Sequence, residues 1–310
     1  MPRIFIDGAA GTTGLVLEQR LRGIPGMELI LLPEDYRKNA EARRRAIAAS
    51  DVTFLCLPDA AAREAVCLAE GTDTILIDAS TAHRTAPGWA YGFPELSAAH
   101  RKAVQTSNRI AVPGCHAGGV IALVYPLVAA GVLDAAARLH CFSLTGYTGG
   151  GKGMIADYEA APRRTDLEAP RQYALSQAHK HLPEICALCG LQNAPVFSPI
   201  VGAFPRGMEV TVQLHRGDLA ESLSVPQLNE LYTAHYKDAQ LITVGITDES
   251  GFLTANALAG QDRMQIAAFG SEERILLIAR FDNLGKGASG AALQCMNLRL
   301  GLAEATGLSV

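Results

Sequence analysis

The chain has 310 residues, of which 49% are hydrophobic and 19% are charged, and its formal net charge is −4. This composition is ordinary for a globular protein, and the length suits two domains or one large one. No block of like charges is long enough for a nucleic-acid-binding arm, and no apolar run approaches the ~20 residues of a membrane span. Seven cysteines without paired spacing, and no signal peptide, predict a reduced cytoplasmic protein.

The first third of the chain alternates short apolar runs with helix-like segments. The predicted strands span residues 3–7, 27–32, 52–57 and 74–78, and the predicted helices span 14–21, 39–49 and 60–70. One more short strand precedes Pro113-Gly114. This alternation predicts a parallel sheet with helices on both faces, in a region that ends near Cys115.

A glycine-rich turn, Gly8-Ala-Ala-Gly-Thr-Thr-Gly14, joins the first predicted strand to the first predicted helix. Glycines let the backbone turn tightly and approach a pyrophosphate, which then rests on the helix N-terminus. The strand before the turn and the helix after it favour dinucleotide binding over a tight turn without a ligand. The predicted cofactor-binding residues here are Gly8, Ala10, Gly11, Thr12, Thr13 and Gly14.

The segment after the second predicted strand bears on the choice between NAD and NADP. An acidic residue there favours the ribose hydroxyls of NAD, and an arginine accepts the 2′-phosphate of NADP. Pro33-Glu-Asp-Tyr-Arg-Lys38 carries both signs, and within it Arg37 and Lys38 favour NADP. The basic cluster that follows, Arg43-Arg-Arg45, is expected to be a solvated helix face.

A polar segment, Asp78-Ala-Ser-Thr-Ala-His-Arg84, follows the fourth predicted strand. It lies at the carboxyl edge, where open α/β sheets bind ligands. Arg84 is a candidate to hold a carboxylate or a phosphate in a bidentate fork. His83 is expected to be structural or to face solvent.

Cys115 directly follows Pro113-Gly114 and opens an Ala/Val/Leu-rich run that predicts a helix. A thiol at a helix N-terminus feels the positive end of the helix dipole, which lowers its pKa and makes it a nucleophile. The alternative is a buried structural cysteine, a common fate of free cysteines. The residues alone leave both readings open.

The middle of the chain contains longer strands separated by fewer helices. The predicted strands span residues 138–145, 207–215, 241–245 and 265–268, and a final helix is predicted over 287–305. This pattern predicts an α+β part with a mixed or antiparallel sheet.

A glycine-dense loop occupies residues 146–153, directly after the strand predicted to end at Thr145. The backbone at Gly149 and Gly150 is able to pass close to a phosphate or a nicotinamide. Lys152 is a candidate to bind an anion. A flexible hairpin loop is the alternative reading.

The run His179-Lys-His-Leu-Pro-Glu184 supplies candidate proton-transfer groups. If the segment is helical, residues two apart do not share a face, so at most one of the two histidines is expected to reach the thiol. Glu184 follows His181 by three positions and is a candidate to orient its imidazole. Surface histidines at a helix end are the alternative. Cys186-Ala-Leu-Cys189 lacks a second ligand pair, so no metal site is predicted.

These features together resemble the N-acetyl-gamma-glutamyl-phosphate reductases of the shorter type, nearly from end to end. The motifs that carry the resemblance are Gly8 to Gly14, Leu55-Cys-Leu-Pro-Asp59, Asp78 to Arg84, Tyr91-Gly-Phe-Pro-Glu-Leu96, Pro113-Gly-Cys115, His179-Lys-His-Leu-Pro-Glu-Ile185, Asn283-Leu-Gly-Lys-Gly-Ala-Ser-Gly290 and Met296-Asn-Leu-Arg299. The chain departs from the pattern at Val112, where many relatives have Asn, at His116, where they have an aromatic residue, and in Thr148-Gly-Gly-Gly151.

The resemblance implies a Rossmann-type, doubly wound NADP-binding domain over residues 1–115, completed by a C-terminal helix at 286–310, and an α+β catalytic domain with a mixed sheet at 116–285. It implies Cys115 as the nucleophile and His181 as the proton shuttle, with His179 and Glu184 nearby. The further cofactor contacts it implies include Pro58, Ser80 and Asn283, and the substrate contacts are Arg84 and Lys152.

The implied reaction reduces an acyl phosphate with NADPH and releases inorganic phosphate. It belongs to arginine biosynthesis. The resemblance also implies a homodimer or a homotetramer. No metal, nucleic acid or membrane takes part. Two alternatives stay open: an acyl-phosphate reductase of the aspartate-semialdehyde dehydrogenase type, and a non-catalytic NADP-binding sensor.

Overall fold

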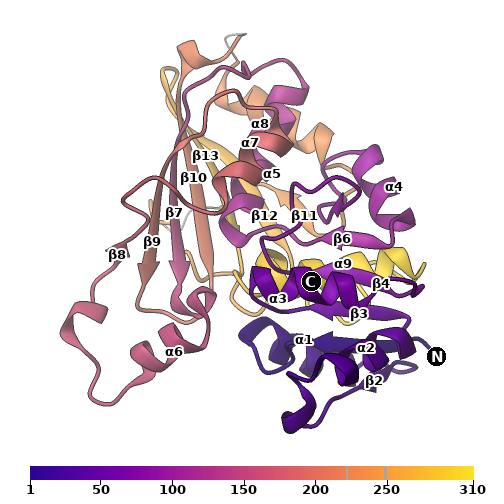
Figure 1. Ribbon diagram of the computed structural model, residues 1–310. Coiled ribbons are helices and arrows are strands. Elements are labelled where there is room, and N and C mark those ends of the chain that lie inside the picture. The colour runs from indigo at the N-terminus through magenta and orange to yellow at the C-terminus, as the bar shows by residue number, and fades with distance from the viewer. Residues whose placement is uncertain (221–222, 248–249) are drawn as a thin grey trace. The chain divides into compact units, whose positions relative to one another are not determined.

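The computed structural model describes residues 1–220, 223–247 and 250–310. They form two compact units, shown in Figure 1. The first, here called the N-terminal unit, contains residues 1–114 and 288–309; the second, the central unit, contains residues 115–287 and Val310.

A six-stranded sheet forms the middle of the N-terminal unit. Its strands are β1 (Arg3–Asp7), β2 (Glu28–Ile30), β3 (Val52–Leu55), β4 (Ile75–Asp78), β5 (Ala90–Tyr91) and β6 (Arg109–Ala111). Their order is β2-β1-β3-β4-β6-β5, and every neighbouring pair is parallel. The predicted parallel sheet is confirmed, and most residues of its strands are apolar because helices cover both faces.

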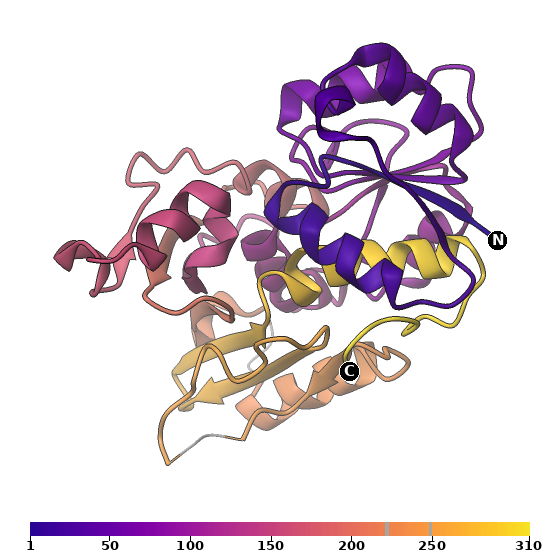
Figure 2. The same cartoon turned by 90° about the horizontal axis from the view of Figure 1, so that it is seen from below.

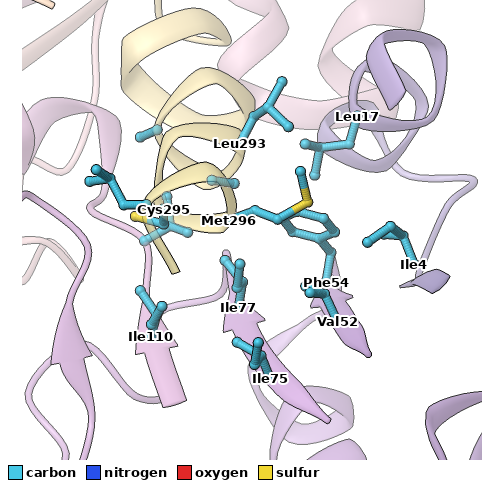
Figure 3. Packing of buried hydrophobic residues seen from close by; sticks show 14 of the residues in the cluster. Ile4, Leu17, Val52, Phe54, Ile75, Ile77, Ile110, Leu293, Cys295 and Met296 are labelled. Atoms are coloured by element: carbon cyan, nitrogen blue, oxygen red, sulfur yellow. The ribbon is translucent and has the colours of Figure 1, made fainter. Parts of the chain in front are cut away.

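Helices cover the two faces of this sheet. They are α1 (Thr12–Arg22), α2 (Ala40–Ala49), α3 (Asp59–Leu68), α4 (Ala98–Thr106) and α9 (Gly290–Arg299), with a 3₁₀ turn η1 (Glu34–Tyr36). α1 and α9 pack on one face, where Leu17, Leu293 and Met296 meet Phe54 and Ile77 (Figures 2 and 3). Residues of α2 and α3 pack with Phe5 and Leu76 on the other face.

The C-terminal helix is shorter than the sequence predicts. A π-helical turn, η5 (Gly285–Ser289), precedes it, and α9 ends at Arg299 rather than at residue 305. Gly301 then has φ of 69°, a left-handed conformation that favours glycine and ends the helix. The Asn297 side chain donates to the carbonyls of Glu304 and Thr306, which holds the following turns against the helix.

A seven-stranded sheet forms the central unit. Its strands are β7 (His140–Gly146), β8 (Arg171–Gln172), β9 (Val196–Gly202), β10 (Met208–His215), β11 (Ile242–Val244), β12 (Met264–Gly270) and β13 (Arg274–Phe281). Their order is β11-β12-β13-β10-β7-β9-β8, with parallel pairs β11–β12 and β7–β9 and antiparallel pairs elsewhere. The predicted mixed sheet is confirmed.

Helices of the central unit are α5 (Cys115–Ala129), α6 (Gly151–Glu159), α7 (Leu182–Cys189) and α8 (Val225–His235), with 3₁₀ turns η2 (Tyr147–Gly150), η3 (Thr165–Leu167) and η4 (Arg216–Asp218). α5 packs on β10 and β13, and α7 and α8 pack on α5 (Figure 1). A Cβ at Gly119 of α5 would lie 2.5 Å from a methyl of Val210, so glycine permits the close approach of helix and sheet. Among the described residues, no helix combines the length and apolarity needed to cross a membrane.

Candidate active site

The thiol of Cys115 lies on the first residue of α5 and is partly exposed. The first N–H groups of a helix have no partner within the helix, and they point toward this end. Close packing holds the position, because a Cβ at Gly287 would lie 3.1 Å from the Cβ of Cys115. The predicted placement of this cysteine at a helix start is therefore observed.

Three imidazoles gather at the residue that follows Cys115. The ring of His116 lies 5.6 Å from each of the rings of His179 and His181, and those two rings lie 4.7 Å apart, measured between centroids. Phe197 closes the cluster, 5.1 Å from the His179 ring and 5.5 Å from the His116 ring. The cluster therefore brings both predicted histidines beside the residue that follows Cys115.

Both histidines reach the cluster because the segment that carries them is not helical. α7 begins at Leu182, so His179 and His181 precede it in a turn. The expectation that at most one of them reaches the thiol was conditional on a helical segment, and this condition is not met. The backbone N–H of His181 donates to Nδ1 of His179 at 3.2 Å, which holds the His179 imidazole against the backbone of His181.

His116 was not among the residues predicted for catalysis, yet it is the centre of this cluster. Its Nδ1 lies 2.7 Å from Oγ of Ser143, and its Nε2 lies 2.7 Å from the hydroxyl of Tyr173. Burial, with the charges of His179 and Lys180 nearby, lowers the pKa of His116 to about 3. This imidazole is neutral at physiological pH and works as a hydrogen-bonding group.

Tyr173 was also not predicted to be a site residue. Burial raises the pKa of its hydroxyl, and the nearby charge of Cys115 raises it further. The phenol is therefore neutral, and it shares a hydrogen bond with Nε2 of His116. Its place after the short strand β8 gives no sequence signal, whereas His116 directly follows the candidate nucleophile.

Glu184 lies on the first turn of α7 with 2% of its surface exposed. Its proposed role in orienting His181 stays a prediction. The neighbouring pair Cys186 and Cys189 behaves as structural thiols, since burial raises the pKa of both. Within residues 1–220, 223–247 and 250–310, no group of three or more His, Cys, Asp or Glu side chains is arranged to hold a metal ion.

The glycine-dense loop is held in place by the segment before β10. The N–H of Gly146 donates to the carbonyl of Gly207 at 2.9 Å, and the Thr148 hydroxyl donates to that of Pro205 at 2.6 Å. Asn283 donates to Oγ1 of Thr148 at 3.0 Å and accepts from the N–H of Gly207 at 3.0 Å. The structure thus brings Asn283 against the loop that carries Gly149 and Gly150, while Lys152 is exposed on α6.

A cavity of about 580 Å³ opens at the carboxyl ends of β1 and β2 in the N-terminal unit. The described residues that line it include Asp7, Gly8, Ala9, Ala10, Leu32, Glu34, Asp35, Arg37, Lys38 and Leu57. The cavity therefore joins the predicted glycine turn to the predicted pair of basic residues. Gly11, Thr12, Thr13, Gly14, Pro58 and Ser80 lie outside this lining.

The glycine turn fits a pyrophosphate. Gly8 has φ of 89°, and a Cβ there would lie 2.3 Å from the carbonyl oxygen of Cys56. No side chain caps the N-terminus of α1, which begins at Thr12. Oγ1 of Thr12 is buried and has no hydrogen-bond partner among the described residues. An anion at this helix end would satisfy these donors.

Arg43 is buried, so the expectation of a solvated face is wrong for this member of the basic cluster. Its guanidinium lies 2.9 Å from Oδ2 of Asp7 and 2.8 Å from Oε2 of Glu64. The cause is helical spacing, because Arg43 shares the inward face of α2 with Ala46 and Ile47. Asp7 at the cavity is thereby paired with a cation.

The segment after β4 forms a network around the buried carboxylate of Asp78. Ser80 donates to it through its N–H at 2.8 Å and its hydroxyl at 2.7 Å, and Nδ1 of His83 lies 2.6 Å away. His83 also stacks on Trp89 at 4.2 Å, which agrees with the structural role expected for it. Nε and Nη2 of Arg84 donate to backbone carbonyls, at 2.9 and 3.3 Å.

Pro58 is the N-cap of α3, directly after the loop that leaves β3. This position is at the same carboxyl edge of the parallel sheet as the glycine turn, because the carboxyl ends of parallel strands share one edge. The structure brings Pro58 to that edge without placing it in the cavity lining.

Family comparisons identify the class of protein that this fold and site define. Residues 34–104 match the model of the semialdehyde dehydrogenase NAD binding domain, and residues 115–283 match that of the semialdehyde dehydrogenase dimerisation domain. The chain is thus an oxidoreductase of the semialdehyde dehydrogenase class.

Curated relatives narrow the class to one family. The N-acetyl-gamma-glutamyl-phosphate reductase of Brucella ovis is 45% identical over 97% of this chain and 99% of its own length. The enzyme of the same name from Sinorhizobium medicae is 42% identical over 96% of this chain and 99% of its own. The chain belongs to the N-acetyl-gamma-glutamyl-phosphate reductase family.

Solved structures share the fold at much lower identity. Aspartate semialdehyde dehydrogenase II from Vibrio cholerae superposes with a TM-score of 0.74 at 16% identity, covering 97% of this chain and 98% of its own. The Candida albicans aspartate semialdehyde dehydrogenase with NADP has a TM-score of 0.69 at 13% identity, covering 96% and 98%. At these identities the likeness concerns the fold alone.

Proposed function

We propose that this protein reduces N-acetyl-gamma-glutamyl phosphate to N-acetyl-glutamate 5-semialdehyde with NADPH and releases inorganic phosphate, as a step of arginine biosynthesis. Relatives at 42% and 45% identity over nearly the whole chain are named for the reduction of this acyl phosphate. The observation that carries the proposal is Cys115 at the first position of α5, next to the cluster of His116, His179 and His181.

Cys115 is the proposed nucleophile. The helix dipole and the N–H groups of the first turn of α5 stabilise its thiolate. The thiolate attacks the acyl carbon, the bond from that carbon to the phosphate oxygen breaks, and phosphate leaves with the bonding electron pair. The enzyme retains the acyl group as a thioester, which splits one difficult step into two easier ones.

NADPH supplies, when bound, the hydride that reduces this thioester. The chain supplies the proton: His181 is proposed to protonate the developing thiohemiacetal oxygen and to take the proton back when the carbon–sulfur bond breaks. General acid–base help of this kind contributes roughly 10²–10⁴-fold. His179, bonded to the His181 N–H, and Glu184, buried on α7, are proposed to position that imidazole.

The cofactor is proposed to bind along the cavity of the N-terminal unit, with its pyrophosphate on the turn from Gly8 to Gly14 and its 2′-phosphate on Arg37 and Lys38. The cavity lining and the room denied to a Cβ at Gly8 support this assignment. The further proposed cofactor contacts are Pro58, Ser80, Gly149, Gly150 and Asn283, and the proposed substrate contacts are Arg84 and Lys152.

We propose a separate function for each of the two parts of the chain. Residues 1–115 with 286–310 are proposed to bind NADPH, and residues 116–285 to carry out catalysis and assembly into a homodimer or homotetramer. The match of residues 115–283 to a dimerisation domain supports assembly in this part of the chain. The proposed location is the cytoplasm.

The test runs the reaction in reverse, with N-acetyl-glutamate semialdehyde, phosphate and NADP. The formation of NADPH is measured by its absorbance. The wild type is expected to be active, and Cys115→Ala to lose turnover by at least about 10⁴-fold while still binding NADPH. Cys186→Ala is the matched control and is expected to be active. Preference for the non-acetylated aldehydes, including aspartate semialdehyde, contradicts the proposed substrate. Activity of Cys115→Ala within tenfold of the wild type contradicts the covalent mechanism.

A further inference from the structure

Arg206 has no role in the mechanism above, but it lies where a substrate-binding residue would be useful. It occupies the loop between β9 and β10, whose carbonyls at Phe204 and Pro205 accept hydrogen bonds from the N–H groups of Tyr147 and Thr148. This is the loop against which the glycine-dense segment is held. Arg206 is therefore part of the framework that carries Gly149 and Gly150.

One side of the Arg206 guanidinium forms an ion pair with a buried carboxylate. Its Nε lies 2.8 Å from Oδ2 of Asp282, a residue with no exposed surface. The other oxygen of Asp282 accepts from the N–H groups of Leu284 and Gly285, at 2.7 and 3.1 Å. Asp282 is thus held by backbone donors, and its charge pairs with that of the guanidinium.

The guanidinium has unused hydrogen-bonding capacity within the part of the chain that the structure describes. Nη2 of Arg206 is buried, and neither Nη2 nor Nε makes a hydrogen bond to a described residue. Leaving a buried donor unpaired costs about 1–3 kcal/mol, and more for a charged group. A ligand that presents an acceptor there recovers this cost on binding.

A short chain of contacts links Arg206 to the thiol. Asp282, which holds Arg206, accepts through its carbonyl from the N–H of Gly287 at 3.0 Å. Gly287 in turn packs against Cys115, where an added Cβ would lie 3.1 Å from the cysteine Cβ. All of these residues belong to the central unit.

We propose that Arg206 is a substrate-binding residue, which uses Nη2 to bind an oxyanion held near Cys115. The inference deepens the proposed function and rests on it, because that substrate carries two such groups: its carboxylate and its phosphate. Arginine suits either, since its planar fork matches both. Asp282 is the residue that positions the fork.

The first experiment needs no substrate. Alkylation of Cys115 is measured by mass spectrometry with iodoacetate, an anion, and with iodoacetamide, its neutral counterpart. In Arg206→Gln the ratio of the two rates is expected to fall at least fivefold, with the iodoacetamide rate nearly unchanged. Arg216→Gln, in a half-buried arginine of the same unit, is the control and is expected to keep the wild-type ratio.

The second experiment identifies the oxyanion. In the reverse reaction, Arg206→Gln is expected to raise the KM for phosphate or the KM for the semialdehyde at least tenfold, with Arg206→Lys intermediate and the KM for NADP unchanged. The substrate whose KM rises is the one that Arg206 binds.

A purely structural role predicts a lower unfolding midpoint with neither KM changed by more than twofold and an unchanged alkylation ratio, in both Arg206→Gln and Arg206→Lys. That result overturns the proposal. A wild type that is inactive on the semialdehyde counts against the proposed function, whereas the alkylation ratio still decides whether Arg206 attracts an anion to Cys115.

Discussion

At the scale of single residues, burial lowers the reactivity of some of the cysteines. Burial raises the pKa of Cys141 to about 12, and it raises that of Cys189 as well. Such thiols stay protonated and act as small apolar groups. Cys115 differs in its partial exposure and in its place on the first turn of a helix.

The neutral state of His116 predicts a pH-dependent stability. Its folded pKa of about 3 lies below the ordinary histidine pKa of 6.5, so between these values the unfolded chain binds a proton that the folded chain does not. Stability from this residue is complete above the unfolded pKa and is lost as the pH falls toward the folded one. Between pH 7 and about 5.5 the loss is about 1 kcal/mol.

Urea unfolding at the two pH values checks this prediction. His116→Phe, which restores an aromatic ring at this position, is expected to lose about 1 kcal/mol less than the wild type over the interval. His235→Phe, a histidine outside the cluster, is a control. An equal loss in wild type and His116→Phe contradicts a neutral His116.

At the scale of elements, α5 contains a proline, and a side chain from another segment replaces the hydrogen bond that this proline cannot donate. Pro126 lacks the N–H that would donate to the carbonyl of Ala122, four residues earlier. The hydroxyl of Tyr236 donates to that carbonyl at 2.8 Å, and the hydroxyl of Tyr232 donates to Leu123 at 2.7 Å. The chain after α8 thus satisfies the acceptor that the proline leaves buried.

We expect Tyr236→Phe to lower the free energy of unfolding by about 1–3 kcal/mol, because the carbonyl of Ala122 then has no donor. Tyr232→Phe is the matched control, since the carbonyl of Leu123 keeps its helical N–H donor, and its cost is expected to be about 1 kcal/mol or less. Chemical denaturation measures both. Equal losses of unfolding free energy in the two variants would show that Tyr236 does not replace the hydrogen bond that Pro126 cannot donate to Ala122.

The loop between β2 and α2 carries the predicted cofactor preference. Arg37 and Lys38 line the cavity beside Glu34 and Asp35, so both signs of charge meet there. We expect Arg37→Ala with Lys38→Ala to raise the KM for NADPH at least tenfold and to leave the KM for NADH nearly unchanged, because only NADPH carries the 2′-phosphate. Equal losses with both cofactors contradict this assignment. Arg44→Ala, an exposed arginine of α2, serves as a control.

At the scale of the whole molecule, the mixed sheet carries exposed apolar side chains on the face opposite α5. Strand alternation places Ser143 and Val210 toward α5, and therefore Phe142 on the opposite face. Phe142, Leu276 and Val196 are exposed there by 39%, 39% and 51%. Exposed apolar side chains gathered on one sheet are typical of a protein interface.

We expect this face to form a contact between subunits of the proposed homo-oligomer. Phe142→Glu with Leu276→Glu is expected to produce a monomer, because burying a charge in an apolar interface is costly. Light scattering coupled to size exclusion measures the mass. Leu15→Glu, at an exposed leucine of α1, is the control and is expected to leave the oligomer intact. An unchanged mass of the double variant places the interface elsewhere.

Local patterns of the sequence determined the elements that form from neighbouring residues. The alternation of apolar runs predicted β1 to β4 and the helices between them, and the Pro-Gly turn predicted the start of α5 at Cys115. Glycine at position 8 predicted a tight turn, because the conformation needed there excludes a Cβ. Such features depend on backbone sterics and period, which a single segment already contains.

Only the tertiary structure decided which distant groups meet. Three groups of contacts join segments separated by tens of residues. They are the cluster of His116 with His179 and His181, the ion pair of buried Arg43 with Asp7, and the ion pair of Asp282 with Arg206. No period in the sequence encodes these pairings. They follow from how the sheets and helices pack, which brings polar groups into low-dielectric surroundings where each one must find a partner.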